Sequence, residues 1–69
     1  MSLQWIKVNS SLTMSHDSKG YEYRVRESFD GDYIAIQERR SGREQTRRER
    51  AATPGHAFDL CEQWDREVR

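Results

Sequence analysis

Apolar residues recur at helical spacing over one segment, residues 54–68. The repeat falls every three or four residues on Ala57, Leu60, Cys61, Trp64 and Val68, with Phe58 on its flank. Thr53 is a suitable N-cap, and Pro54 suits the first helical position, where its missing N–H needs no partner. The pattern predicts an amphipathic helix whose apolar stripe packs against a sheet formed by the preceding residues.

Strict alternation of apolar and polar residues predicts a half-buried strand over residues 21–28. Tyr21, Tyr23 and Val25 share one face of this strand, and charged residues occupy the other. Residues 29–32 contain the Asp-Gly pair typical of a tight hairpin turn, which predicts a return strand over residues 33–39.

The two faces of the return strand carry different residue types. We expect Ile34 and Ile36 to point inward, toward the helix, and we expect Tyr33, Ala35 and Gln37 to point outward. This assignment gives the helix an apolar partner surface of tyrosines, valine and isoleucines.

The remaining elements are weaker. Residues 3–8 read as a short strand with Trp5 and Ile6 on opposite faces, and residues 12–15 permit a second strand after a turn at 9–11. Residues 44–52 favour a helix by propensity but have no apolar stripe, and they follow a turn at 40–43. We therefore favour an edge strand there, whose charges would deter unwanted pairing.

These elements predict an α+β fold, a three- to four-stranded antiparallel meander with one C-terminal helix packed across one face. Residues 1–69 form a single small domain with an N-terminal strand or hairpin at 3–16, a meander at 21–52 and the helix at 54–68. Only 33% of the residues are hydrophobic, so the core is thin and a large substrate pocket is not expected.

The net charge of zero hides an uneven distribution along the chain. Residues 1–36 carry a balance of −1, residues 37–50 carry +3, and residues 51–69 carry −2. The basic segment holds six arginines and no lysine: Arg39, Arg40, Arg43, Arg47, Arg48 and Arg50. A basic hairpin on a mildly acidic body is therefore expected.

No motif in the sequence identifies a reaction. His16-Asp17 and the pair Asp30 and Asp32 lie in predicted turns, where aspartate favours local backbone hydrogen bonds. The single cysteine, Cys61, lies on the apolar stripe and is expected to be a buried, unreactive thiol. We expect no enzymatic activity, no catalytic residue, no cofactor and no metal site.

The setting expected from the sequence is cytoplasmic. One cysteine allows no intrachain disulfide, and neither a signal peptide nor a membrane-spanning stretch is found, so no membrane partner is expected.

The arginine hairpin is the main candidate for function. Arginine makes planar bidentate contacts to phosphate and guanine, and a two-stranded ribbon fits a major groove. The expected contact residues are Arg24, Arg26, Tyr33, Gln37, Arg39, Arg40, Arg43, Arg47, Arg48 and Arg50. The simpler interpretation is a solvated edge strand in which Glu38, Glu44 and Glu49 neutralise nearby arginines.

The predicted strands over residues 21–28, 33–39 and 45–51, followed by the helix, resemble the three-strand-plus-helix domains with which phage integrases bind arm-type DNA sites. In that family the sheet enters the major groove and the helix backs it. The resemblance covers residues 21–68. It implies groove-facing roles for Arg24, Arg26, Gln37, Arg39, Arg47 and Arg48.

A second hypothesis places the protein among small protein-binding inhibitors or adaptors, such as phage and mobile-element accessory proteins that act as anti-CRISPR or other anti-defence factors. The arginines would then engage an acidic protein surface, or the exposed aromatics Trp5, Phe29 and Tyr33 would supply the contacts. A homodimer is a further option, because a chain this small gains burial by association.

Overall fold

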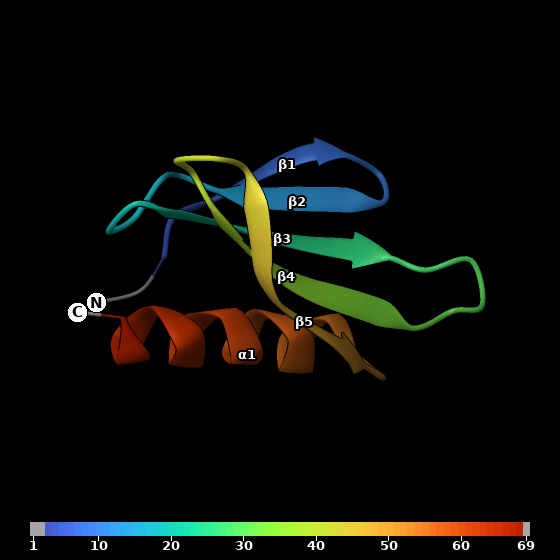
Figure 1. Ribbon diagram of the computed structural model, residues 1–69. Helices are drawn as coiled ribbons and strands as arrows, with labels where there is room; N and C mark the ends of the chain where they lie inside the picture. The colour runs from blue at the N-terminus through green and yellow to red at the C-terminus, as the bar shows by residue number, and fades with distance from the viewer. Residues whose placement is uncertain (1–2, 69) are drawn as a thin grey trace.

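The computed structural model describes residues 3–68 and shows five antiparallel strands followed by one helix (Figure 1). The strands are β1 (Trp5–Asn9), β2 (Leu12–Ser15), β3 (Tyr21–Glu27), β4 (Tyr33–Arg39) and β5 (Glu44–Ala51), and the helix is α1 (Pro54–Glu67). The strands pair in chain order as a meander. The predicted α+β class is confirmed, and the strand count is five instead of three to four.

The additional strands come from a complete N-terminal hairpin. Asn9 Oδ1 accepts hydrogen bonds from the Ser11 amide at 2.9 Å and from its hydroxyl at 3.1 Å, which closes the turn between β1 and β2. Ser15 Oγ then accepts the Tyr23 amide at 2.9 Å in a buried position. The hairpin is therefore joined to β3 by side-chain as well as ladder hydrogen bonds.

Residues 44–51 form a strand, as the sequence analysis favoured. Gly42 and Arg43, with φ of 91° and 55°, make the turn that sends β5 back along β4. The pairing shifts between Gln37 and Glu38, so Thr46 has no direct partner on β4. This bulge lets the Thr46 hydroxyl donate to Gln37 Oε1 at 2.6 Å.

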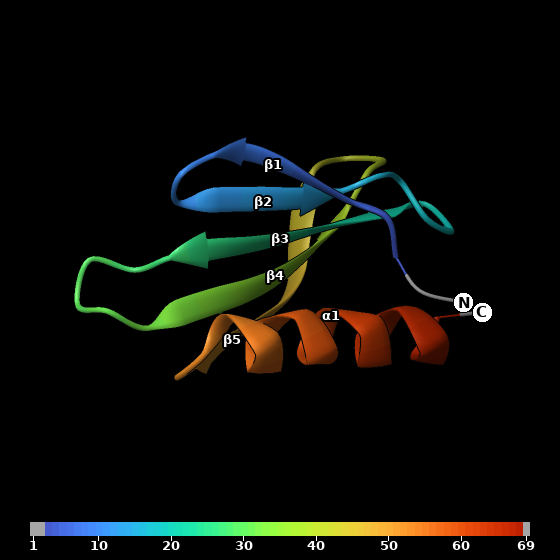
Figure 2. The same ribbon diagram turned by 180° about the vertical axis from the view of Figure 1, so that it is seen from behind.

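Helix α1 begins and ends close to the predicted positions. Thr53 Oγ1 accepts the His56 amide at 3.2 Å, and Pro54 is the first helical residue. Val68 is the C-cap, and its amide donates to the Trp64 carbonyl at 3.2 Å. Figure 2, the view from behind, shows the helix lying across one side of the sheet. No helix within residues 3–68 is long and apolar enough to cross a bilayer.

The predicted inward and outward faces of β4 are reversed. Val25 pairs with Ala35, and Tyr23 pairs with Gln37, so Ala35 and Gln37 share the helix-facing side with the β3 core residues. Ile34 and Ile36 point to the other side, opposite the helix. The reason lies in the β3–β4 turn.

The β3–β4 turn has an odd number of residues between the two residues that its closing hydrogen bond joins. The Ser28 amide donates to the Asp32 carbonyl at 2.7 Å, which leaves three residues in the loop, and Gly31 adopts a φ of 95°. A four-residue loop over 29–32 would have paired Val25 with Ile36. A shift of one residue moves every side chain of a strand to the other face.

The helix-side core is built from small residues around a few large ones. Ala35, Ala57 and Cys61 are all 0% exposed, so α1 approaches the sheet closely. Trp64 and Tyr23 fill the space beside them, and Tyr23 is also 0% exposed. The wrongly assigned isoleucines are replaced in this core by Ala35, Leu3 and Ala51.

Candidate functional site

The sheet face opposite α1, called the open face below, carries two parallel rows of side chains. Residues that pair directly across antiparallel strands share a face. One row joins Arg26, Ile34 and Arg50, and the other joins Arg24, Ile36 and Arg48, each running from β3 over β4 to β5. Each isoleucine therefore lies between two arginines, and these six residues are called the arginine–isoleucine grid.

The isoleucines of the grid are buried although they lie on the face of the sheet that α1 does not cover. Ile34 is 7% exposed and Ile36 is 3% exposed, and neither belongs to the helix-side core cluster. The long aliphatic stems of arginine cover apolar surface while their charged heads stay in water. The grid therefore covers the apolar side chains of β4 and presents guanidinium groups at the surface.

Two of the four grid arginines are held by carboxylates. Arg24 Nη2 lies 2.6 Å from Glu38 Oε1, and Glu38 keeps only 9% of its side chain exposed. Arg50 Nη1 lies 2.6 Å from Asp30 Oδ2 and 3.1 Å from Asp32 Oδ2, which ties β5 to the β3–β4 turn. These contacts fix where the two guanidinium groups lie.

The pKa of the Asp30 carboxylate reflects the contacts made within this turn. Hydrogen bonds from the Ser28 hydroxyl, from Arg50 and from the Asp32 amide lower the pKa of Asp30 to about 2. Hydrogen bonds to the carboxylates of Asp30 and Asp32 raise the pKa of Arg50 above its ordinary value. The prediction that Asp30 makes local turn contacts is confirmed.

The other two grid arginines are uncommitted. Among the described residues, neither Arg26 nor Arg48 forms an ion pair, and both side chains are exposed. They lie at diagonal corners of the grid, on β3 and β5. The four arginines are separated by about 7 Å along each strand and about 10 Å from β3 to β5.

The N-terminal hairpin extends the open face with apolar residues. Leu12 pairs with Arg26, Met14 pairs with Arg24, and Ile6 pairs with Met14. A hollow of about 450 Å³ lies where β2 meets the grid, lined by Leu12, Met14, Arg24, Arg26, Ile36 and Gln45 among others. The open face is thus apolar beside β2 and basic toward β5.

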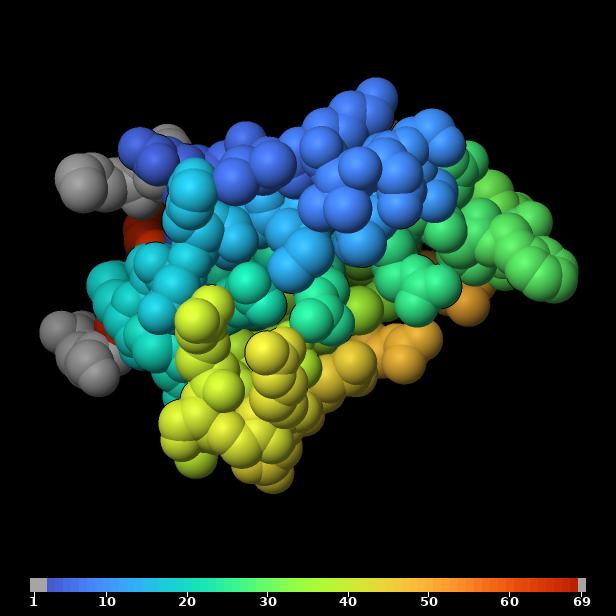
Figure 3. Space-filling model, turned by 90° about the horizontal axis from the view of Figure 1, so that it is seen from above, coloured from blue at the N-terminus to red at the C-terminus, as the bar shows by residue number. Residues whose placement is uncertain are grey.

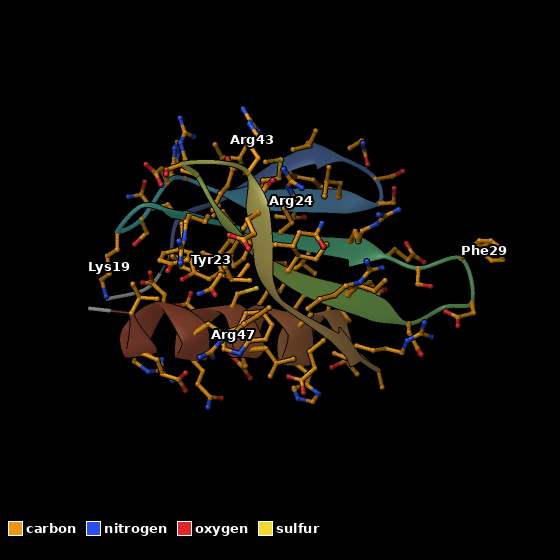
Figure 4. All side chains as sticks on the ribbon, in the orientation of Figure 1. Lys19, Tyr23, Arg24, Phe29, Arg43 and Arg47 are labelled. Carbon is orange, nitrogen blue, oxygen red and sulfur yellow. The ribbon has the colours of Figure 1, made fainter. Side chains whose placement is uncertain are left out.

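The remaining predicted arginines do not join this surface. Arg47, next in sequence to Arg48, turns to the helix side, where its Nη1 lies 2.7 Å from Glu67 Oε1 and its guanidinium lies over the Trp64 ring at 5.9 Å. Figure 4 shows Arg47 beside α1 and Arg43 at the β4–β5 turn, pointing away from the helix. A contiguous six-arginine surface is therefore not formed.

Arg39 and Arg40 are also engaged elsewhere. The Arg39 guanidinium lies 5.9 Å from the centre of the Tyr21 ring. Arg40 lies 3.7 Å from Asp17 and 3.9 Å from Glu22 through its guanidinium nitrogens, at the end of the sheet. The structure splits the sequence cluster because successive strand residues point to opposite faces.

Gln37 is not available to a partner, and its predicted contact role is wrong on this ground. The residue is 3% exposed and faces the helix side. Its Nε2 donates to the Tyr23 hydroxyl oxygen at 3.1 Å, and its Oε1 accepts from Thr46. Burial raises the pKa of Tyr23 to about 12, which keeps the phenol neutral.

The three aromatics expected to be exposed differ in their placement. Phe29 is 97% exposed at the tip of the β3–β4 turn, where Figure 4 shows it projecting from the body. Trp5 and Tyr33 are partly buried against the core, and the Trp5 ring packs edge-on to Phe58 at 4.7 Å. Only Phe29 fits the prediction.

Cys61 and Asp65 are buried and occupy structural positions. Burial raises the pKa of the Cys61 thiol to about 12, and the residue is 0% exposed, as expected for an unreactive thiol. Within residues 3–68, no three His, Cys, Asp or Glu side chains gather as metal ligands would. The carboxylate of Asp65 is buried and accepts the Ser18 hydroxyl at 2.9 Å.

Sequence reasoning missed the apolar half of the open face. A β3–β4 turn over residues 29–32 predicts Ile34 and Ile36 in the core, and the sequence analysis gives Met14 no role on this face. The alternation Glu22, Arg24, Arg26 on the outward side of β3 did indicate a charged face. Only the pairing register shows which β4 side chains lie beside these arginines.

Comparisons with protein-family models, curated proteins and solved structures gave no match to this chain.

Proposed function

We propose that the protein is a small non-enzymatic binding module that engages the phosphate backbone of nucleic acid, most directly duplex DNA, through the open face of its sheet. The observation that carries the proposal is the arginine–isoleucine grid, in which four arginines from two strands flank a buried apolar row. Guanidinium groups carried on neighbouring strands of one sheet face offer the fork-like contacts that phosphate oxygens accept.

The composition of the open face favours a duplex over a single strand. Proteins that bind single strands stack bases on exposed aromatic side chains. The grid and its β2 neighbours contain isoleucine, leucine, methionine and arginine but no aromatic residue. Contacts to phosphates and to base edges in a groove are the interactions that such a surface offers.

The sequence neighbours Arg47 and Arg48 provide a sharp test. Replacing Arg26 and Arg48 with glutamate reverses the two uncommitted grid charges, and replacing Arg39 and Arg47 makes the same charge change on the helix side. Binding of a labelled duplex is measured by fluorescence anisotropy over a salt series. Four phosphate contacts give a slope of about −3.6 in log K against log salt, and fewer give a shallower slope.

We expect the Arg26→Glu/Arg48→Glu chain to lose binding and the Arg39→Glu/Arg47→Glu chain to retain most of it. Circular dichroism spectra of the two variants serve as the control that both are folded. Equal losses in the two variants would show that overall charge, not the open face, drives binding. A parent chain that binds no duplex even at low salt would contradict the nucleic-acid proposal.

A protein partner is the alternative function, and Phe29 is the observation that favours it. A fully exposed phenylalanine is unusual on a surface, and its turn is braced by the Ser28, Asp30 and Arg50 hydrogen bonds. An inhibitor or adaptor, of the kind that phage and mobile elements encode, would use this tip against an acidic or apolar protein surface. Capture of a protein by the parent chain and by Arg26→Glu/Arg48→Glu, but not by Phe29→Ala, would select this alternative.

A further inference from the structure

We propose that the free edge of β1 pairs with the β1 edge of a second copy of this chain, in antiparallel register about a two-fold axis at Ile6. The two five-stranded sheets then form one continuous sheet. This inference does not depend on the proposed nucleic-acid function. It rests on the two edges of the sheet, on the backbone groups that β1 leaves free and on the side chains beside them.

The two edges of the sheet differ in their protection. β5 is exposed at every position except Ala51 and carries five charged residues, Glu44, Arg47, Arg48, Glu49 and Arg50, which deter pairing. β1 carries a single charge, at Lys7, and its Ile6 and Val8 are 48% and 52% exposed. Figure 3 looks down on β1 and shows this hairpin, in blue, at the surface.

The free backbone groups of β1 can be assigned from its pairing with β2. The His16 amide donates to the Gln4 carbonyl at 3.1 Å, and the register continues through Trp5–Ser15 to Ile6–Met14. Hydrogen-bonded and non-bonded pairs alternate along an antiparallel ladder. The backbone of Ile6 therefore points toward β2, and the amides and carbonyls of Trp5 and Lys7 point to the free edge.

A two-fold axis at Ile6 uses all of these groups. Trp5 of each copy then exchanges both hydrogen bonds with Lys7 of the other, and the two Ile6 side chains meet in the close, non-bonded pair between them. The two Lys7 charges avoid each other, because each lies opposite a tryptophan. The alternative axis at Lys7 would place the two ammonium groups face to face, which is unfavourable.

The geometry also defines what the dimer presents. The axis runs perpendicular to the sheet, so both helices lie on one side and both arginine–isoleucine grids lie on the other. The apolar row Met14–Ile6 of one copy continues into that of the second. A five-residue edge buries less area than the ~1,200 Å² of the smallest stable interfaces, so we expect weak, concentration-dependent association.

Engineered cysteines test both the pairing and its register. Ile6→Cys places two thiols opposite each other at a Cα separation of about 4.5 Å, within disulfide range. Val8→Cys is the matched control, because the two copies of residue 8 lie ~13 Å apart in this register. The native Cys61 is 0% exposed and does not interfere. Under mild oxidation we expect Ile6→Cys, and not Val8→Cys, to form a covalent dimer.

Sedimentation velocity provides a second measurement without engineered thiols. The parent should shift toward twice the 8.2 kDa mass of one chain as its concentration rises to the millimolar range. Ile6→Lys opposes two charges at the axis and should weaken the dimer at least tenfold. Phe29→Lys makes the same kind of change at the distant turn and should leave the dimer intact.

Two results would overturn the proposal. One is a parent chain that stays at the mass of a single chain at millimolar concentration, which would leave the β1 edge to a strand of a different protein. The other is equal cross-linking of Ile6→Cys and Val8→Cys, which would mean random collision. Duplex binding is measured separately, so a monomeric chain that binds DNA refutes this inference alone.

Discussion

The two faces of the sheet bury their apolar residues by different means. On the helix side, Trp64, Cys61 and Ala57 of α1 pack directly onto Tyr23 and Ala35. On the open face, Ile34 and Ile36 are nearly as well buried, and their neighbours there are the arginines paired beside them and, around Ile36, Leu12, Met14 and Gln45. The helix side is closed by the packing of α1, which cannot rearrange unless the chain unfolds. The open face is lined by side chains that can move.

This difference indicates which face can serve a partner. A binding surface must be ordered before the partner arrives, yet it must expose groups that the partner can reach. The grid meets both conditions, because Arg24 and Arg50 are held by carboxylates and Arg26 and Arg48 are exposed without an ion pair among the described residues. On the helix side, the polar groups of Gln37 are bonded to Tyr23 and Thr46, and Arg47 is paired with Glu67.

The largest effect is expected from Trp64→Ala, which removes the largest side chain that α1 packs into the helix-side core. Trp64 is 6% exposed, and truncation of a buried tryptophan costs ~3–5 kcal/mol of unfolding free energy. For a domain this small, the variant should be largely unfolded, as measured by a thermal melt. A melting temperature within two or three degrees of the parent would place Trp64 outside the core.

A smaller loss is expected from Ala35→Leu, which tests the register of β4. Ala35 is 0% exposed beneath α1, so the larger side chain overpacks the core at a cost of about 1–3 kcal/mol. Ile36→Leu on the open face nearly conserves volume, so it controls only for the introduction of leucine into β4 and should cost less. Urea unfolding of both variants compares the two faces directly. A neutral Ala35→Leu would mean that residue 35 faces solvent.

Cys61 reports on opening of the helix-side core without altering stability. Its thiol is buried and has a pKa raised to about 12, so the reactive thiolate is nearly absent at neutral pH. We expect a water-soluble thiol reagent to label the native chain at least 100-fold more slowly than the denatured chain. Rapid native labelling would show that the helix separates from the sheet far more often than its packing suggests.

The smallest effect is expected at the edge of the open face, from Asp30→Asn. The pKa of Asp30 is lowered from 3.8 to about 2 in the folded chain. Its contribution to stability is therefore fully present above about pH 4 and is lost as the pH falls toward 2. The parent's melting temperature should fall over this range by slightly more than that of Asp30→Asn. Identical profiles for the two chains would mean that the contacts of the Asp30 carboxylate with Ser28, Arg50 and the Asp32 amide add nothing to stability.

Elements with a local cause are predictable from the sequence. The spacing of Ala57, Cys61 and Trp64 predicts the helix and its buried face, because a period of 3.6 residues needs no knowledge of distant residues. The cap at Thr53 and the alternation of β3 are local for the same reason. The lack of an apolar stripe in residues 44–52 argues against a docked helix and favours the strand that the structure shows.

The tertiary structure decided which residues share a surface. A β3–β4 loop one residue longer would place Ile34 and Ile36 under the helix. The observed three-residue loop places both on the open face. Alternation along β5 likewise divides Arg47 from Arg48, although they are neighbours in the chain. Strand register is set by turn geometry and by the fit of Ala35 beneath α1. Neither leaves a periodic pattern in the sequence. The sequence analysis therefore places on one basic ribbon arginines that the structure divides between opposite faces of the sheet.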